Sequence, residues 1–294
     1  MPPSRIAEVR RFNRAVTARI GALDDRFLGQ RRPLGEARLL WEIGPGGCEL
    51  RALRARLGLD SGYTSRLLRA LEADGLVTVA PAESDRRVRV ARLTRAGLAE
   101  RAVLDERSDE LARALLEPLG EADQRALVAA MREVERLLVV IRPVDPEHPD
   151  AKRCLAAYFA ELNRRSDTGF DPADGVTAEP HELRPPAGLL LVAYRGAEPV
   201  GCGALKHYAD GATDLKRMWV ADAARGLGLG RRLLGELERH AAARGVRTVR
   251  LETSRHLTEA IALYRSAGYV EVPAFNAEPF ADHWFAKRLP DSGP

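Results

Sequence analysis

The sequence predicts two domains, a mainly α-helical winged helix-turn-helix domain over residues 1–140 and an α/β (α+β) domain with a mixed central sheet over residues 141–294. Three observations predict this division. A chain of 294 residues that is 45% apolar is long enough for two ordinary cores. Apolar residues in the first half follow helical spacing, whereas the second half alternates apolar strands with helices. Between them, the strand-like run 138–141 meets a turn-rich stretch at 142–149.

Four helices are predicted before any strand. Apolar residues recur every three or four positions from Ile6 to about Leu28, which predicts one long amphipathic helix. Pro33 begins a second helix over 34–43. After a glycine-rich break, a short helix over 50–57 ends at Gly58, and Asp60 or Ser61 caps another that runs to Ala73.

A hairpin and two more helices complete the first domain. The segments 76–79 and 88–93 alternate like paired strands and are joined by a polar loop over 81–87. Thr94 caps a helix over 95–117, and a second helix follows over 121–138.

The second domain begins with a helix over 150–165 and a loop over 166–188 whose length suggests a functional segment. The elements expected after it are strands 189–194, 200–207 and 215–220, a helix over 229–244, strand 248–253, a helix over 257–267, and strands 269–272 and 284–289.

Composition excludes several classes. The sequence has no apolar run of membrane-spanning length and no signal-like N-terminus, so we expect no membrane association and a cytoplasmic location. Three widely spaced cysteines, Cys48, Cys154 and Cys202, form no C-x-x-C pair and are expected to be free thiols. The histidines lack ligand spacing, so no metal is expected.

Positive charge is concentrated in one segment of the first domain. Residues 1–142 hold 26 arginines and 21 acidic residues, and residues 51–95 alone hold 10 arginines against five acidic residues. The second half has one more acidic than basic residue. A local excess of this kind favours a polyanionic partner.

Two short helices joined by 58–61 match a helix-turn-helix, in which the second helix presents its N-terminal residues to the DNA major groove. The side chains that we expect to reach double-stranded DNA carry hydroxyl and guanidinium donors. They are Ser61, Thr64, Ser65, Arg66 and Arg69.

The tip of the hairpin carries Asp85, Arg86 and Arg87. A guanidinium there can enter a narrow minor groove while the neighbouring carboxylate orients it. Taken singly, these are ordinary surface charges. Their coincidence with a turn and a hairpin favours a DNA contact.

The first domain resembles the MarR family of winged-helix regulators over residues 5–140. The residues that carry the resemblance are the long first helix, the turn 57–61, the stretch 71–77, the wing 84–87 and the segment 93–97. The resemblance implies a homodimer that forms through the first and last helices. It also implies two half-sites on a pseudo-palindromic operator.

The segment Arg225-Gly226-Leu227-Gly228-Leu229-Gly230 lies between a predicted strand and a predicted helix. Its glycines can expose backbone N–H groups at a helix N-terminus, which suits a pyrophosphate. The spacing does not fit a dinucleotide fingerprint, and the Gly-Lys-Ser/Thr of a P-loop is absent.

The remaining fit, Arg-x-x-Gly-x-Gly, resembles the coenzyme A loop of the GNAT superfamily of N-acetyltransferases, and the flanks 215–220 and 260–269 add to it. The resemblance covers 139–289 and implies acetyl-CoA as co-substrate, with central strands that splay around its pantetheine arm. Met218 and Val220 would meet that arm through backbone groups. Leu257 departs from the family, where many relatives carry Asn.

The resemblance also implies direct attack of a neutral amine on the thioester. Tyr264 matches the position of the family's usual general acid, although a tyrosine on such a helix often only packs. Candidates for the base are Asp214, Glu252 and His207, and a water chain would also suffice.

We therefore expect a bifunctional transcriptional regulator and N-acetyltransferase whose acceptor amine the sequence does not identify. Two alternatives stay open. One is a MarR-type repressor whose second domain only senses acetyl-CoA or a ligand. The other is an acetyltransferase that keeps the helical half for dimerisation.

Overall fold

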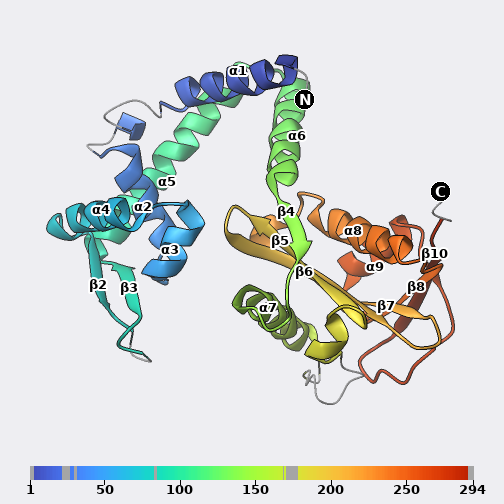
Figure 1. Cartoon of the computed structure of the whole chain (residues 1–294). Helices are drawn as coiled ribbons and strands as arrows, with labels where there is room; N and C mark the ends of the chain where they lie inside the picture. Colours follow the sequence, from blue (N-terminus) through green and yellow to red (C-terminus); the bar gives the residue numbers. More distant parts are fainter. Residues whose placement is uncertain are drawn as a thin grey trace. The chain divides into compact units, whose positions relative to one another are not determined.

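The computed structural model of the chain describes residues 3–21, 27–29, 32–82, 85–167, 169 and 178–290. The chain forms two compact units, Met1–Ala129 and Ala130–Pro294, each with its own buried cluster (Figure 1). Helix α6 (Glu121–Leu138) crosses the division between the units.

The N-terminal unit is mainly helical and contains a small antiparallel sheet with strand order β1-β3-β2. Its elements are α1 (Pro3–Arg19), the short 3-10 helix η1 (Phe27–Gly29), α2 (Leu34–Ile43), β1 (Cys48–Glu49), α3 (Leu50–Leu57), α4 (Ser61–Ala73), β2 (Val77–Pro81), β3 (Arg89–Leu93), α5 (Arg95–Leu116) and the start of α6.

Local chemistry explains the boundaries of the helix-turn-helix. Helix α3 ends because Gly58 takes a left-handed φ of 64° and donates back to the last turn. Helix α4 begins where the Asp60 carboxylate accepts from the backbone N–H of Tyr63 at 2.8 Å. The α2, α3 and α4 leucines, among them Leu39, Leu53 and Leu71, form the centre of the core.

Helix α1 is shorter than its apolar pattern predicts. It ends at Arg19, because Gly21 turns the backbone to a φ of 64° and its N–H bonds to the Ala18 carbonyl. Leu28, expected to be helical, has a φ of 56° inside η1. The intervening residues 22–26 lie outside the described part of the chain.

The C-terminal unit contains a mixed seven-stranded sheet of order β4-β5-β6-β7-β8-β10-β9. Its elements after α6 are β4 (Val140–Pro143), α7 (Pro149–Arg165), η3 (Pro180–Leu183), β5 (Gly188–Arg195), β6 (Glu198–His207), β7 (Thr213–Val220), η4 (Asp222–Ala224), α8 (Leu229–Ala243), β8 (Thr248–Thr253), α9 (Thr258–Ser266), β9 (Val270–Glu271) and β10 (His283–Arg288).

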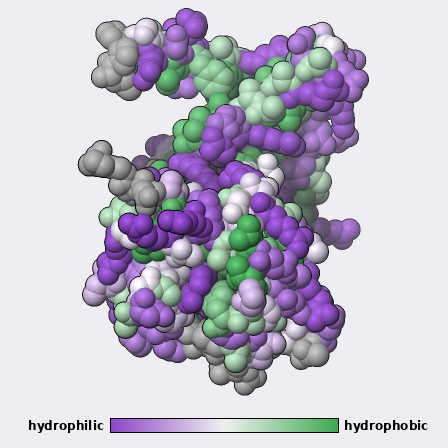
Figure 2. All heavy atoms as spheres, turned by 90° about the vertical axis from the view of Figure 1, so that its right-hand side faces the viewer, coloured by the Kyte–Doolittle hydropathy of each residue, from purple (hydrophilic) through white to green (hydrophobic). Residues whose placement is uncertain are grey.

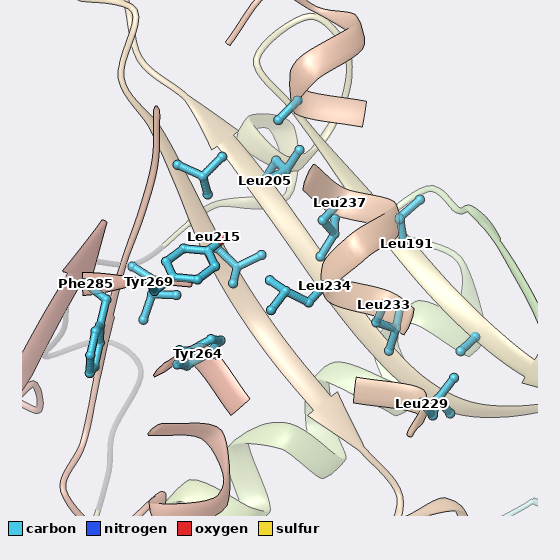
Figure 3. Close-up of a cluster of buried hydrophobic side chains, with 14 of the residues drawn as sticks. Leu191, Leu205, Leu215, Leu229, Leu233, Leu234, Leu237, Tyr264, Tyr269 and Phe285 are labelled. Atoms are coloured by element: carbon cyan, nitrogen blue, oxygen red, sulfur yellow. The ribbon is translucent and has the colours of Figure 1, made fainter. Parts of the chain in front are cut away.

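Helices cover both faces of this sheet (Figure 1). Helix α8 and helix α9 pack on one face, where Leu191, Leu215 and Phe285 join leucines of α8 in the larger core (Figure 3). Helix α7 packs on the other face against Leu190 and Val192. The alternation along β5 follows the two-residue period of a strand. The observed order confirms the fold class that the sequence predicts.

Two irregularities open the centre of the sheet. Strands β7 and β8 are parallel and pair only at Thr213 with Val249 and Asp214 with Arg250, although both strands continue beyond this point. The pairing of β6 with β7 also shifts register, at a β-bulge where Arg217 takes a φ of 58°. Strand β7 therefore leaves β8 after Asp214, which agrees with the expected splay.

Within the described residues, no helix is long and apolar enough to cross a membrane.

Candidate functional site

A cavity of about 440 Å³ lies at the N-terminus of α8, between the splayed half of β7 and helices α7 and α9. Its wall includes Arg225, Gly226, Gly228, Leu229 and Gly230 of the glycine-rich loop. Leu227 of the same loop is half-buried and is not part of the wall. The first helical bond of α8 runs from Arg232 N to Gly228 O. The N–H groups of the first turn, at residues 229–231, precede this bond and are therefore available to an anion.

Two of the three glycines of this loop are required by its backbone conformation. Gly226 and Gly228 have φ values of 78° and 72°, which L side chains rarely adopt. A Cβ at Gly228 would meet no protein atom closer than the Arg136 Cδ at 3.5 Å, so it would project into open space. That space is suited to a pyrophosphate, which needs close approach to backbone.

The Arg225 side chain braces the loop. Its Nε donates to the Val220 carbonyl at 3.1 Å, and its terminal nitrogens pair with Glu161 at 2.5 Å and Asp222 at 2.7 Å. Glu161 is buried on α7 and also pairs with Arg165 at 3.0 Å. Because these partners occupy the Arg225 guanidinium, we expect phosphate to contact the backbone of the loop.

A second cavity, of about 370 Å³, lies where β7 and β8 separate. It shares wall residues with the first cavity, so the two form adjoining parts of one site. The shared residues are Tyr158, Leu162, Arg165, Met218, Leu257, Ala260 and Tyr264. Val220 lies only on the wall of the first cavity, farther along β7. The expected pantetheine contacts, Met218 and Val220, therefore lie on the splayed part of β7.

Tyr264 lies on α9 and faces both cavities, although only 5% of the residue is exposed. It packs edge-on against Tyr269 with ring centroids 5.8 Å apart, on the α9 side of the core (Figure 3). Burial, and then the neighbouring Tyr158 and Glu252, raises the pKa of its phenol. The phenol therefore stays protonated at neutral pH, as a general acid must.

The three candidate bases occupy different surroundings. Glu252 lines the second cavity, where it contacts the Lys216 ammonium and accepts from Asn276 Nδ2 at 3.4 Å. Asp214 lies on β7 opposite Arg250, with which it pairs at 2.9 Å, and is outside both walls. His207 also lies outside both walls, bonded to Thr213 Oγ1 at 3.0 Å. Of the three, Glu252 alone faces the site.

Among the described residues, no group of three or more His, Cys, Asp or Glu side chains is arranged to hold a metal ion.

In the N-terminal unit, α4 presents exposed residues on the side opposite the core. Ser61, Ser65, Arg66 and Arg69 are exposed, and the Arg66 guanidinium lies 5.0 Å from the Tyr63 ring centroid. The Ser65 hydroxyl donates to Ser61 O at 2.7 Å and retains its acceptor lone pairs. Four of the five residues expected to reach DNA from this helix are therefore accessible.

The prediction that Thr64 reaches DNA is wrong. The residue is 1% exposed, and its hydroxyl donates to the Asp60 carbonyl at 2.8 Å within the helix. Its side chain points into the core that α4 shares with α2, so it is not available to a base or phosphate. Spacing alone did not show this, because a small hydroxyl residue is compatible with both faces of a helix.

The wing is formed by β2, β3 and the turn between them. Asp85 accepts from the Arg87 backbone N–H at 2.9 Å and pairs with the Arg87 guanidinium at 3.2 Å. These two bonds to Arg87 lower the pKa of the Asp85 carboxyl. The Arg87 side chain is 91% exposed, and Arg86 is also exposed. Ser84 of the same motif lies outside the described residues.

The apolar side of α1 is open to solvent. Its regularly spaced residues Ile6, Val9, Phe12 and Val16 are 40% to 59% exposed, and Ile20, directly after the helix, is 39% exposed. Apolar residues are also exposed on α6, at Met131, Val134, Leu137 and Leu138. Figure 2 shows apolar residues, in green, among the hydrophilic residues of one face of the molecule.

Several site residues were not identified from the sequence. Glu161 and Arg165 stand four apart on α7, a spacing that places them on one side of a helix and was the available signal. Arg217 lies within the strand motif that the sequence singled out. Nothing in that motif indicates its bulge, because a positive φ at a non-glycine residue depends on strand pairing.

Comparison with known proteins gives the class of each unit. Residues 156–269 match the acetyltransferase (GNAT) family, and residues 32–88 match the MarR family. The chain therefore combines a segment similar to the MarR family with a segment similar to the acetyltransferase (GNAT) family.

Two relatives in sequence support the second assignment. The uncharacterized N-acetyltransferase YjgM of Escherichia coli strain K12 is 30% identical over 131 residues, 43% of this chain and 78% of YjgM. The IAA acetyltransferase of Azospirillum brasilense is 41% identical over 90 residues, which is 30% of this chain and 59% of that relative's length. A solved GNAT acetyltransferase from Staphylococcus aureus Mu50 aligns over 52% of this chain and 99% of its own, with 16% identity and a TM-score of 0.45.

The chain belongs to the GNAT family of acetyltransferases, and its residues 32–88 match the MarR family. Members of the GNAT family use acetyl-CoA, which is therefore the co-substrate of the C-terminal unit.

Proposed function

We propose that the protein is bifunctional, a DNA-binding transcriptional regulator and an acetyl-CoA-dependent N-acetyltransferase acting in the cytoplasm. We place the domain boundary near residue 140. Residues 1–140 would bind DNA and form the dimer, and residues 141–294 would transfer the acetyl group. The observation that carries the enzymatic half is the adjoining pair of cavities at the splay of β7 and β8, with Tyr264 facing both.

In this proposal, acetyl-CoA supplies an activated acetyl group and binds with its pyrophosphate at the N-terminus of α8. The loop glycines allow the close backbone approach, and the positive end of the helix dipole favours the phosphate charge. Met218 and Val220 meet the pantetheine arm through backbone groups on the free edge of β7.

The reaction is direct transfer. The neutral amine attacks the thioester carbonyl, the carbon–sulfur bond breaks, and Tyr264 gives its proton to the departing thiolate. Glu252 is our candidate for receiving the amine proton, because among Asp214, Glu252 and His207 it is the residue that lines the cavity wall. In the same wall this carboxylate contacts the Lys216 ammonium.

The regulatory half of the proposal assigns base contacts to α4 and a minor-groove contact to the wing. Ser61, Ser65, Arg66 and Arg69 present donors on one helix face, and Arg87 projects from the wing beside its orienting carboxylate. Two copies of the chain would read two half-sites of a pseudo-palindromic operator.

A homodimer is part of this proposal because α1 has an uncovered apolar stripe at helical spacing. An exposed stripe of this kind is characteristic of a helix that packs against another chain. Sedimentation of the full-length protein should give twice the chain mass, and Phe12→Glu should shift it toward the monomer. A monomeric wild-type protein would rule this assignment out.

The enzymatic half is tested by incubating the full-length protein with acetyl-CoA and a panel of amines. We expect thiol release and an acetylated amine by mass spectrometry. The regulatory half is tested by enrichment of genomic fragments on the purified protein. Fragment enrichment together with acetyl-CoA binding, but without acetylation of any amine, would favour the alternative of a repressor that senses acetyl-CoA. Acetylation without fragment enrichment would favour an enzyme that uses its first domain for dimerisation.

A further inference from the structure

The second cavity contains an arginine whose position depends on the β-bulge of β7. In a regular strand, neighbouring side chains point to opposite faces of the sheet. At the bulge, consecutive residues Lys216 and Arg217 both line the same cavity, because the register shift and the φ of 58° at Arg217 redirect its side chain. Bulges next to active sites commonly aim a side chain in this way.

The two cations have different partners. The Lys216 ammonium contacts Glu252 and lies 3.9 Å from Asp214, so carboxylates of the protein neutralise its charge. The Arg217 guanidinium instead lies over aromatic rings of α7, 4.5 Å from the Phe159 centroid and 5.8 Å from the Tyr158 centroid. Its terminal nitrogen donates to the Ala178 carbonyl at 3.5 Å.

An aromatic platform holds a guanidinium in a fixed plane and leaves its outer donors open to a ligand. Arg217 is half-buried, so a charge-assisted bond made there is screened less than one at the surface. The planar donor fork matches the two oxygens of a carboxylate. The phosphate loop is not the partner of Arg217, because Arg217 lines the second cavity and is not part of the wall around the loop.

We infer that the acceptor amine carries a carboxylate, as a free amino acid does, and that Arg217 binds this carboxylate and determines specificity. The inference rests on the proposed acetyl transfer. The cavity of about 370 Å³ has room for a small molecule of this class. With the carboxylate on Arg217, the amine would lie toward Glu252 and Tyr264, which line the same cavity.

The test uses full-length protein, acetyl-CoA, and pairs of probes that differ in the carboxylate, such as phenylalanine with phenylethylamine and lysine with cadaverine. Thiol release gives kcat/KM for each probe. We expect the wild type to favour the carboxylate member of the best pair by at least about tenfold. A charge-assisted hydrogen bond contributes about 1.5–3 kcal/mol, and 1.4 kcal/mol corresponds to a factor of ten.

Arg217→Met should remove this preference and leave the KM for acetyl-CoA nearly unchanged, whereas Arg217→Lys should keep part of it, since a point charge remains. Arg255→Met is the matched control. Arg255 lines the same cavity but is held by Asp282, so its loss should leave the preference intact.

Three results would overturn the inference. The first is equal or better acetylation of the carboxylate-free amines by the wild type. The second is an undiminished carboxylate preference in a folded Arg217→Met protein. Either result would remove the inference about Arg217 but would leave the proposed acetyltransferase activity in place. Absence of acetylation with every probe would overturn the proposed enzymatic function and this inference together.

Discussion

The guanidinium of Arg225 lies 2.5 Å from the buried Glu161 carboxylate, which joins the glycine-rich loop to helix α7. Glu161 also accepts from Trp219 Nε1 at 3.0 Å and pairs with Arg165. One carboxylate thus holds three elements around the proposed cofactor cavity.

Replacing Glu161 with Gln should weaken acetyl-CoA binding, because Arg225 and Arg165 lose the buried carboxylate that they share and keep only the more exposed Asp222 and Glu259 as charged partners. We expect the dissociation constant for acetyl-CoA to rise about three- to tenfold, in line with about 1 kcal/mol for a partly exposed pair, while kcat changes little. Calorimetry with acetyl-CoA measures this effect. Glu259→Gln is the control, since Glu259 also pairs with Arg165 but its side chain is 72% exposed. Equal effects of the two substitutions would contradict the role of Glu161.

Gly228→Val should abolish acetyl-CoA binding without unfolding the C-terminal unit. The added side chain would meet little protein but would enter the cavity, and the φ of 72° would cost about 1–2 kcal/mol in strain. Gly235→Ala in the same helix offers a control, since a Cβ there would meet nothing within 4 Å. That change should stabilise the helix by about 1 kcal/mol and leave affinity unchanged. Normal affinity in a folded Gly228→Val protein would remove the loop assignment.

Local sequence patterns determine some boundaries of the fold but not others. The helix at 34–43 and the strand at 248–253 have the predicted bounds, since apolar period and flanking residues agree there. The first helix was predicted too long because its apolar spacing continues past Gly21, which ends the helix. Strand β1 was not predicted, because two residues are too few to show a period and its pairing with β3 is long-range.

Some residues of the candidate site were likewise predicted from local patterns, and others were not. The loop glycines and Tyr264 were found because their spacing is local, and they line the cavities. Arg217 and Glu161 were not found, because their roles depend on strand register and on contacts between helices. Asp214 and Glu252 could not be distinguished from the sequence, since only the sheet shows that Asp214 pairs with Arg250 and that Glu252 faces the cavity.

The C-terminal unit should lose stability at alkaline pH. Burial raises the pKa of Tyr158 to about 12, with the nearby Arg217 opposing the effect. In the unfolded chain the pKa of tyrosine is about 10. The resulting stabilisation is complete below about pH 10 and is lost as pH rises toward 12, because the unfolded chain releases the proton first. Urea midpoints measured from about pH 9 to pH 11.5 should fall more steeply for the wild type than for Tyr158→Phe. Parallel curves of urea midpoint against pH for the two proteins would contradict this role of Tyr158.

DNA binding should weaken steeply with salt, since each neutralised phosphate releases counterions. Arg87→Ala should cost about 1–3 kcal/mol of operator binding if the side chain enters the minor groove. An enriched genomic fragment serves as the probe, titrated at several salt concentrations. Arg113→Ala on α5 is the control, because Arg113 is exposed but lies outside the wing and α4. Unchanged affinity in the Arg86 and Arg87 double alanine variant would exclude the wing contact.

Tyr264→Phe should lower kcat by at least about tenfold, with acetyl-CoA affinity nearly unchanged, because general acids contribute about 10²–10⁴-fold to turnover. The phenol is suited to this role, since burial raises its pKa and keeps the proton in place until the thiolate forms. Loss of one hydroxyl should leave the ring packing on Tyr269 and Phe285 intact. Tyr269→Phe is the control, because that residue is equally buried but lines neither cavity. Wild-type kcat in the Tyr264→Phe protein, measured by thiol release with a saturating acceptor, would show that Tyr264 only packs.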